Sequence, residues 1–234
     1  TAQFVCMKFA IFDLDHTLLP IDSGDAWTRA VISHAGSERE ALERKAIQIN
    51  QDYSAGLMDA DDAVRFQLGL LKRFSRKELD AIREEFLEST VWPQIREKAL
   101  DLLASRRAAG YEIILASGTH RFVTAPIAER LGIRTLLSAT PEGNEKGEFT
   151  GNLVGSHSYR EGKLRLIEAF LAPYFEKGPV ELEGYSDSIN DLPFLTYVSE
   201  KGGRTFAVNP DEKLRAHALR EGWPVMELFA KEDL

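Results

Sequence analysis

Cysteine is almost missing from the chain, which has Cys6 and no other cysteine among its 234 residues. A single cysteine excludes an internal disulfide and a metal site built from cysteines, and this usage suits a reducing cytoplasm. Long apolar runs are missing too. No stretch reaches the roughly 18 residues that a transmembrane helix needs, and the N-terminus lacks the basic region and apolar core of a signal peptide. We therefore expect a cytoplasmic protein with no membrane partner.

Positive charge is also in short supply, because 29 Lys and Arg residues stand against 37 Asp and Glu residues, for a net charge of −8. Such a field does not attract nucleic acid or anionic membranes, so neither is expected as the main partner. A small anionic substrate would need local positive charge instead. With 234 residues and 44% hydrophobic content, the chain can form one full α/β domain and a smaller appendage. Nothing in the sequence indicates an oligomeric state.

Short apolar segments that are typical of buried parallel strands recur along the chain. They are residues 8–14, 111–117, 134–139, 179–186 and 204–210. Amphipathic segments lie between them, such as 94–110 and 122–132, and each of these two ends with a glycine suited to a helix C-terminus. The alternation predicts an α/β core, with a Rossmann-like parallel sheet and helices on both of its faces.

The stretch from about residue 22 to residue 92 breaks this alternation, since it holds helix-like segments and no strand signal. An all-helical block inserted directly after the first strand is most simply a cap over the strand ends. Proline excludes helix from the residue before it, so Trp92-Pro93 is the expected return point. The sequence thus predicts a catalytic core of residues 1–20 and 93–234, with a helical cap domain of residues 21–92.

Residues 139–155 are rich in Gly, Asn and Thr, and they predict a hairpin. This hairpin would be either a second flap over the site or a surface excursion. We favour the surface excursion.

The segment FAIFDLDHTLL at residues 9–19 ends an apolar strand on two carboxylates, Asp13 and Asp15. Ligands bind outside the carboxyl ends of the strands in an open α/β sheet, so a nucleophile and a general acid would lie here. Acids in such loops also form turns and helix caps. The chemical interpretation is favoured because further polar elements follow at other predicted strand ends and helix starts. His16 is expected to point away from the site by strand alternation.

Two of those elements suit a phosphate group. Ser117, Gly118 and Thr119 follow the strand at 111–117 directly, and a hydroxyl with backbone N–H groups at a strand-to-helix turn makes an anion seat. An ordinary N-cap has the same appearance. Lys163 stands early in a predicted helix, where a lysine is electrostatically misplaced unless an anion compensates it. A solvated lysine is the alternative.

A further element, GYSDSIND at residues 184–191, places Asp187 and Asp191 after another strand. Mg²⁺ prefers oxygen ligands and keeps several waters, so Asp13 and Asp187 with a backbone carbonyl would suffice to bind it. Asp191 serves either the metal or, equally well, the cap of the helix that begins near Pro193.

In order and with suitable spacing, four segments resemble the motifs of the haloacid dehalogenase superfamily: DLDHT (13–17), SGT (117–119), the lysine of EGK (161–163) and DSIND (187–191). The cap after the first motif, with DSGDAW (22–27) and RFVTAPIAERLG (121–132), resembles the phosphoserine-phosphatase-like branch. That branch includes phosphoserine, phosphoethanolamine and some bacterial histidinol-phosphate phosphatases. The second of these two segments looks more like the histidinol-phosphate group.

The resemblance implies a Mg²⁺-dependent phosphomonoesterase that works through an aspartyl-phosphate. Asp13 would be the nucleophile, Asp15 the general acid and base, and Ser117 and Lys163 the residues that steady the phosphoryl oxygens. Asp13, Asp15 and Asp187 would form the metal site. Other residues that would bind the substrate are Gly118, Thr119 and Asn190. Because a halide leaves without a proton, the acid Asp15 favours phosphate ester hydrolysis over dehalogenation.

The cap residues carry what the sequence says about the substrate. A cap excludes large polymers, which favours a small phosphate ester. Asp22 falls where phosphoserine phosphatases carry an acid that binds the substrate's amine, and it equally fits a helix cap. Arg65 lies near their carboxylate-binding arginine, although we rank a solvated helix face first. Residues that would line an imidazole pocket, or else serve the core or the surface, are His34, His120, Trp27 and Tyr53.

The favoured function is therefore hydrolysis of a small, aminated phosphate ester, histidinol phosphate or phosphoserine. Two alternatives stay open. A phosphotransferase or mutase would share Asp13 and Asp15 and pass the phosphoryl group to another acceptor. A non-catalytic protein on the same scaffold would bind a phosphorylated metabolite without turnover.

Overall fold

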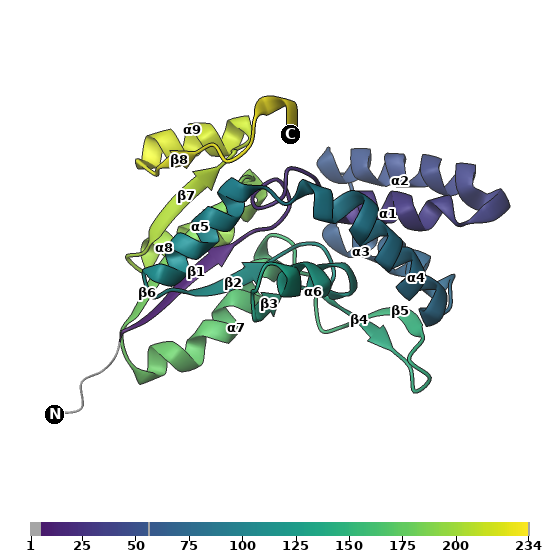
Figure 1. Ribbon diagram of the computed structural model, residues 1–234, viewed down its shortest axis with the longest axis horizontal. Coiled ribbons are helices and arrows are strands. Elements are labelled where there is room, and N and C mark those ends of the chain that lie inside the picture. Colours follow the sequence, from purple (N-terminus) through teal and green to yellow (C-terminus); the bar gives the residue numbers. More distant parts are fainter. Residues whose placement is uncertain (1–5, 56, 234) are drawn as a thin grey trace.

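A parallel sheet of six strands, in the order β3-β2-β1-β6-β7-β8, forms the centre of the protein (Figure 1). The structure is a computed structural model that describes residues 6–55 and 57–233, so residues 1–5 of the expected core lie outside it. The strands are β1 (Met7–Phe12), β2 (Glu112–Ala116), β3 (Thr135–Leu137), β6 (Val180–Ser186), β7 (Arg204–Val208) and β8 (Val225–Met226). All neighbours pair in parallel, which confirms the predicted Rossmann-like α/β fold.

Helices cover both faces of the sheet, and the central strand β1 shows why its sequence is apolar throughout. Phe9 and Ile11 join an apolar cluster with residues of α7 (Glu161–Lys177), whereas Ala10 and Phe12 join a cluster with residues of α5 (Glu97–Ala108). Successive side chains of a strand point to opposite faces, so a strand buried on both faces has no polar side. The remaining core helices are α6 (Arg121–Arg130), α8 (Leu192–Glu200) and α9 (Glu212–Glu221).

Between β1 and α5 the described chain is helical, as predicted. Figure 1 shows these helices grouped to one side of the sheet: α1 (Ser23–Ser33), α2 (Arg39–Ser54), α3 (Ala60–Lys72) and α4 (Arg76–Phe86). A capping box of Ser75 and Glu78 begins α4. The chain returns through a π turn at Leu87–Val91 and a 3₁₀ turn at Trp92–Gln94.

The helices α1 to α4 correspond to the predicted cap and are called the cap helices below. Their apolar core is continuous with that of the sheet. One cluster of buried side chains contains Trp27 and Leu68 of the cap together with Phe12 and Phe122 of the sheet and its helices. The division into residues 1–20 with 93–234 and residues 21–92 stays a prediction.

The hairpin of β4 (Thr140–Gly143) and β5 (Phe149–Val154) corrects an expectation, because it is not a surface excursion. Phe149 is buried against Phe122 of α6, and the Arg76 guanidinium of α4 lies 4.6 Å from the centre of the Phe149 ring. The backbone N–H of Arg76 also donates to the Glu148 carboxylate at 2.6 Å. The hairpin therefore braces the cap.

Within residues 6–55 and 57–233, no helix combines the length and apolarity that crossing a membrane requires.

Candidate active site

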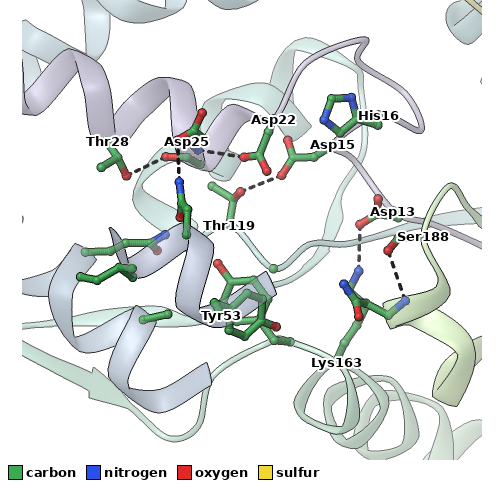
Figure 2. A pocket seen from close by; sticks show the side chains of 18 of the residues that line it. Asp13, Asp15, His16, Asp22, Asp25, Thr28, Tyr53, Thr119, Lys163 and Ser188 are labelled. Atoms are coloured by element: carbon green, nitrogen blue, oxygen red, sulfur yellow. Dashed lines mark hydrogen bonds and ion pairs between the residues drawn. The ribbon is translucent and has the colours of Figure 1, made fainter. Parts of the chain in front are cut away.

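A cavity of about 520 Å³ lies where the cap helices meet the ends of the central strands. Asp13 and Asp15 follow β1, Asp187 follows the neighbouring strand β6, and Lys163 comes from the first turn of α7. Figure 2 shows Asp13 and Lys163 at one part of this cavity and Asp22 and Asp25 of the cap region at another. The topology thus brings together the acids that the sequence places far apart.

Asp13 is held rigidly at the end of β1. Its backbone N–H donates to the Tyr185 carbonyl at 3.0 Å, which continues the parallel ladder one residue past the strand. One carboxylate oxygen accepts from Lys163 Nζ at 2.8 Å, and the other accepts from the Thr17 hydroxyl at 3.1 Å. The side chain is 7% exposed, so its direction is set before any substrate arrives.

Lys163 is a buried cation shared between two carboxylates, Asp13 and Asp191, each 2.8 Å from its Nζ. Burial opposes the charged form, yet the two carboxylates outweigh it and raise the pKa of Lys163 above that of an ordinary lysine. Of the two roles expected for Asp191, the structure contradicts the helix cap, and the metal-facing role stays a prediction. It makes no side-chain cap bond to α8, and it accepts hydrogen bonds from Lys163 and from Ser186 Oγ.

The surroundings of Asp15 favour the protonated form of its carboxyl group. Burial and then the carboxylates of Asp22 and Asp13 raise its pKa to about 8. Its two oxygens accept from the Ser23 backbone N–H at 2.7 Å and the Thr119 hydroxyl at 2.8 Å. A protonated carboxyl group next to a nucleophile can donate its proton to a leaving group.

Asp13 and Asp187 converge on one hydroxyl group, since Thr17 Oγ1 lies 3.1 Å from an Asp13 oxygen and 3.2 Å from an Asp187 oxygen. Burial and then the carboxylates of Asp13 and Asp191 raise the pKa of Asp187 to about 9. These acids therefore crowd together with Lys163 as their common basic partner. Oxygen donors with excess negative charge are what a hard divalent cation requires.

The donor set fits Mg²⁺, which commonly takes one or two carboxylates and keeps its waters. Among residues 6–55 and 57–233, no group of three or more His, Cys, Asp or Glu side chains is arranged to hold a metal. Both carboxylate oxygens of Asp15 are occupied by Ser23 and Thr119. Of the expected ligands, the Asp13 and Asp187 side chains fit, whereas Asp15 has only its main-chain carbonyl to offer.

The residues of the turn after β2 have different positions relative to the cavity. Gly118 and Thr119 line the cavity, but Ser117 is fully buried and its hydroxyl accepts from the Thr119 backbone N–H at 3.1 Å. The structure therefore does not place the Ser117 hydroxyl on the cavity wall, where it was expected. Position 118 requires glycine, because a Cβ there would lie 2.7 Å from the ring of Tyr159.

The expected cap residues separate into three groups. Asp22 and Tyr53 line the cavity, and Asp22 is also the N-cap of α1, accepting from the Asp25 N–H at 2.8 Å. Burial raises the pKa of Asp22. Trp27 is buried in the apolar core. Arg65 lies outside the cavity, since its exposed guanidinium pairs with Asp62 one turn earlier on α3.

Of the histidines, His16 differs from expectation, whereas His34 and His120 take the surface and core roles that were the alternative to an imidazole pocket. His16 lines the cavity, because β1 ends at Phe12 and strand alternation no longer applies four residues later. Its backbone has φ 57°, and its carbonyl accepts from the Asn209 side chain. His34 is exposed and His120 is buried, and neither lines the cavity. Asn190 reaches the cavity edge as an exposed residue.

Sequence reasoning did not single out several residues that line the cavity; all of them except Asp25, which lies in DSGDAW (22–27), fall outside the segments that carry the resemblance. They are Asp25, Thr28, Asn50, Phe66, Gln67 and Tyr159. One signal was available: Ala63, Phe66 and Gln67 all line the cavity and follow the i, i+3, i+4 spacing of one helix face. Tyr159 lies in an irregular loop, where no such period exists.

Comparisons with known proteins agree with this geometry. The family model of the haloacid dehalogenase-like hydrolases matches residues 10–196. A histidinol-phosphatase of Neisseria meningitidis serogroup C (strain 8013) is 35% identical over 224 residues, covering 94% of this chain and 98% of that relative. The phosphoserine phosphatase SerB1 of Mycobacterium tuberculosis (strain ATCC 25618 / H37Rv) is 30% identical over 222 residues, covering 93% and 70%.

Among solved structures, a protein of unknown function from Bordetella pertussis Tohama I superposes with a TM-score of 0.87 at 36% identity, covering 96% of this chain and 100% of that one. An α/β sheet that gathers two aspartates, a lysine and a third acid at its strand ends defines a phosphoryl-transfer scaffold. The chain belongs to the haloacid dehalogenase-like hydrolases, and it is an enzyme of the phosphatase class.

Proposed function

We propose that the protein hydrolyses histidinol phosphate, a phosphate monoester whose alcohol carries an amine and an imidazole but no carboxylate. The charge of the cavity wall carries the proposal. Six aspartates line the cavity: Asp13, Asp15, Asp22, Asp25, Asp187 and Asp191. Lys163 is the only lysine or arginine among the described lining residues, and it is already paired with two carboxylates.

This distribution discriminates between the two favoured substrates. The carboxylate of phosphoserine would need a cation such as a bidentate arginine, and Arg65 lies outside the cavity. An ammonium group, in contrast, suits the acids Asp22 and Asp25. The Neisseria relative carries the name histidinol-phosphatase and is matched over nearly its whole length, which supports the same choice.

The chain's own residues supply the first chemical step. An oxygen of Asp13 attacks phosphorus, the bond from phosphorus to the ester oxygen breaks, and Asp15 gives its proton to the departing alkoxide. Lys163 and the backbone N–H of Gly118 would hold the phosphoryl oxygens as charge shifts. Histidinol leaves, and Asp13 carries the phosphoryl group.

In the second step Asp15, now ionised, takes a proton from water as the water oxygen attacks phosphorus. The bond from phosphorus to Asp13 breaks and inorganic phosphate leaves, which regenerates the Asp13 carboxylate and the protonated Asp15. Mg²⁺ bound by Asp13 and Asp187 would offset the charge of the two anions that must meet. The raised pKa of Asp15 supports its assignment as the acid.

A substrate panel tests the proposal, with released inorganic phosphate measured for histidinol phosphate, phosphoserine and phosphoethanolamine. We expect kcat/KM for histidinol phosphate to exceed that for phosphoserine at least about tenfold, which is about 1.4 kcal/mol of transition-state binding. Asp13→Asn abolishes turnover. A preference for phosphoserine would overturn the substrate, and phosphate passed to an added alcohol in place of water would indicate a phosphotransferase.

A further inference from the structure

Two tyrosine rings meet in the cavity from opposite sides of the molecule. Tyr53 belongs to the last turn of α2 in the cap, and Tyr159 to the loop between β5 and α7. Their ring centres lie 6.0 Å apart, and the ring planes are tilted by 57°. Figure 2 shows Tyr53 in the same cavity as Thr119 and Lys163. The two rings are in contact with each other and, because their planes are tilted, form a V on the wall of the cavity.

Tyr159 is the fixed side of this V. Its ring packs so closely on Gly118 that no Cβ fits between them, and its backbone N–H donates to His157 Nδ1 at 3.2 Å. The His157 ring is itself packed against Gly162, where an added Cβ would lie 2.7 Å from Nδ1. Gly162 precedes Lys163 directly. The position of the Tyr159 ring is therefore tied to both the phosphate turn and the catalytic lysine.

Tyr53 is the side that the cap contributes. Its ring lies 5.3 Å from the guanidinium of Arg160, which directly precedes α7. Tyr53 belongs to neither apolar core cluster of the described residues, although it is partly shielded from water. Arg160 and Tyr159 each contact the Tyr53 ring, and the part of the side chain that lines the cavity is available for a ligand.

The chemistry of the V suits a flat heteroaromatic ring. Aromatic rings attract each other at centre separations of about 4.5–7 Å and prefer tilted or offset contacts. A ring placed across the V can meet the face of one tyrosine and the edge of the other, and a cationic imidazolium is further attracted to a tyrosine face. Phe66 of α3 lines the same cavity and extends the apolar wall.

We propose that Tyr53 and Tyr159 form a ring clamp that binds the heteroaromatic ring of the substrate and thereby sets specificity. The inference rests on the proposed function, since it assigns the imidazole of histidinol phosphate to these two side chains. The clamp separates ring-bearing substrates from amino alcohol phosphates that share the amine and the phosphate alone.

The test compares histidinol phosphate with phosphoethanolamine, which has no ring. Tyr53→Leu is expected to lower kcat/KM for histidinol phosphate about tenfold, or about 1.4 kcal/mol, mainly through KM, and to leave phosphoethanolamine within about twofold. Tyr53→Phe keeps the ring and retains the wild-type preference. Tyr197→Leu, on α8 and outside the cavity, is the matched control and changes neither substrate.

The outcomes are distinguishable. An equal loss on both substrates, or no loss on either, overturns the clamp while the proposed function stands. A wild-type enzyme that hydrolyses phosphoethanolamine or phosphoserine but not histidinol phosphate overturns the proposed function and the clamp together. Thermal unfolding of Tyr53→Leu, compared with Tyr197→Leu, shows whether either change has disturbed the fold.

Discussion

In the proposed mechanism Asp15 supplies the proton of the leaving group. Desolvation and the carboxylates of Asp22 and Asp13 raise its pKa to about 8, although the hydrogen bonds from Ser23 act in the opposite direction. Histidinol is a poor leaving group without a proton, whereas nitrophenolate leaves unaided. We expect Asp15→Asn to slow hydrolysis of histidinol phosphate by about 10²–10⁴-fold, the usual contribution of a general acid.

With p-nitrophenyl phosphate, the same variant should release one equivalent of nitrophenol rapidly and then stall, because no base activates the water. Stopped-flow absorbance and intact-protein mass spectrometry measure the burst and the phosphorylated enzyme. Asp13→Asn is the control, since it gives no burst. If no phosphorylated enzyme accumulates in Asp15→Asn, the proposed role of Asp15 in both steps is contradicted.

His120 links the site's periphery to stability at low pH. Burial lowers the pKa of its imidazole to about 4, and its Nδ1 has no hydrogen-bond partner among the described residues. The unfolded chain takes up a proton near the ordinary pKa of about 6.5. Between these two pKa values the unfolded state binds more protons than the folded state, so the free energy of unfolding rises with pH. The stabilising contribution of neutral His120 is fully present above a pH of about 6.5.

The expected loss between pH 7 and pH 4 is about 3 kcal/mol from this residue. Urea unfolding in EDTA at both pH values measures it, and His120→Gln should reduce the pH dependence. His34→Gln is the control, because His34 is exposed. Equal pH dependence in wild type and His120→Gln would show that other groups cause the loss.

At the scale of elements, the β4–β5 hairpin and α4 both contact the side chain of Phe122. Phe122, in the first turn of α6, packs edge-on against Phe149 of the hairpin, and the guanidinium of Arg83 lies 4.1 Å from its ring centre. The Arg83 guanidinium also donates to the Phe122 carbonyl at 2.9 Å. The cap helix α4 therefore contacts α6 directly, the helix that follows the turn at residues 117–119.

Phe149→Ala should reduce the free energy of unfolding by about 3 kcal/mol, because the buried ring leaves a cavity. Val154→Ala on the same strand is the matched control, since Val154 is 61% exposed and its loss should cost less than about 0.5 kcal/mol. Urea titrations of both variants provide the comparison. Equal effects would mean that the hairpin contributes no specific packing.

Elements with a strong local signal were predictable. The apolar strands β1, β2 and β6 and the capped helices of the cap follow from periodicity, and Asp13, Asp187 and Lys163 follow from their places at strand ends and a helix start. The exposed helix face that was ranked first for Arg65 is what the structure shows, whereas the places of His16 and Tyr159 did not follow from the sequence. Their places depend on loop path, which only packing between distant segments decides.

At the scale of the whole molecule, six of the 37 acidic residues line a single cavity. A divalent cation that binds only the folded protein stabilises it, by about 2.7 kcal/mol at a hundredfold excess over Kd. We expect Mg²⁺ to raise the Tm above that in EDTA and to restore phosphatase activity removed by EDTA.

Asp187→Asn should lose most of this Mg²⁺-dependent rise in Tm while unfolding normally in EDTA, because it removes one charged ligand and its repulsion together. Differential scanning calorimetry measures both effects. Asp59→Asn, which changes the exposed N-cap of α3 outside the cavity, should keep the full Mg²⁺ response. An unchanged response in Asp187→Asn would place the metal elsewhere.

The apolar cluster that joins Trp27 and Leu68 to Phe12 and Phe122 has a consequence for exchange between relatives. If residues 21–92 were removed, the apolar side chains of the sheet and of α6 that pack against the cap helices would be exposed to water. Grafting residues 21–92 onto another enzyme of this kind would therefore transfer the substrate-facing side chains without the surface that orients them. Phe122 and the β4–β5 hairpin would have to be transferred together with residues 21–92. The part of the chain that must be exchanged to transfer the proposed substrate choice is therefore larger than the inserted segment.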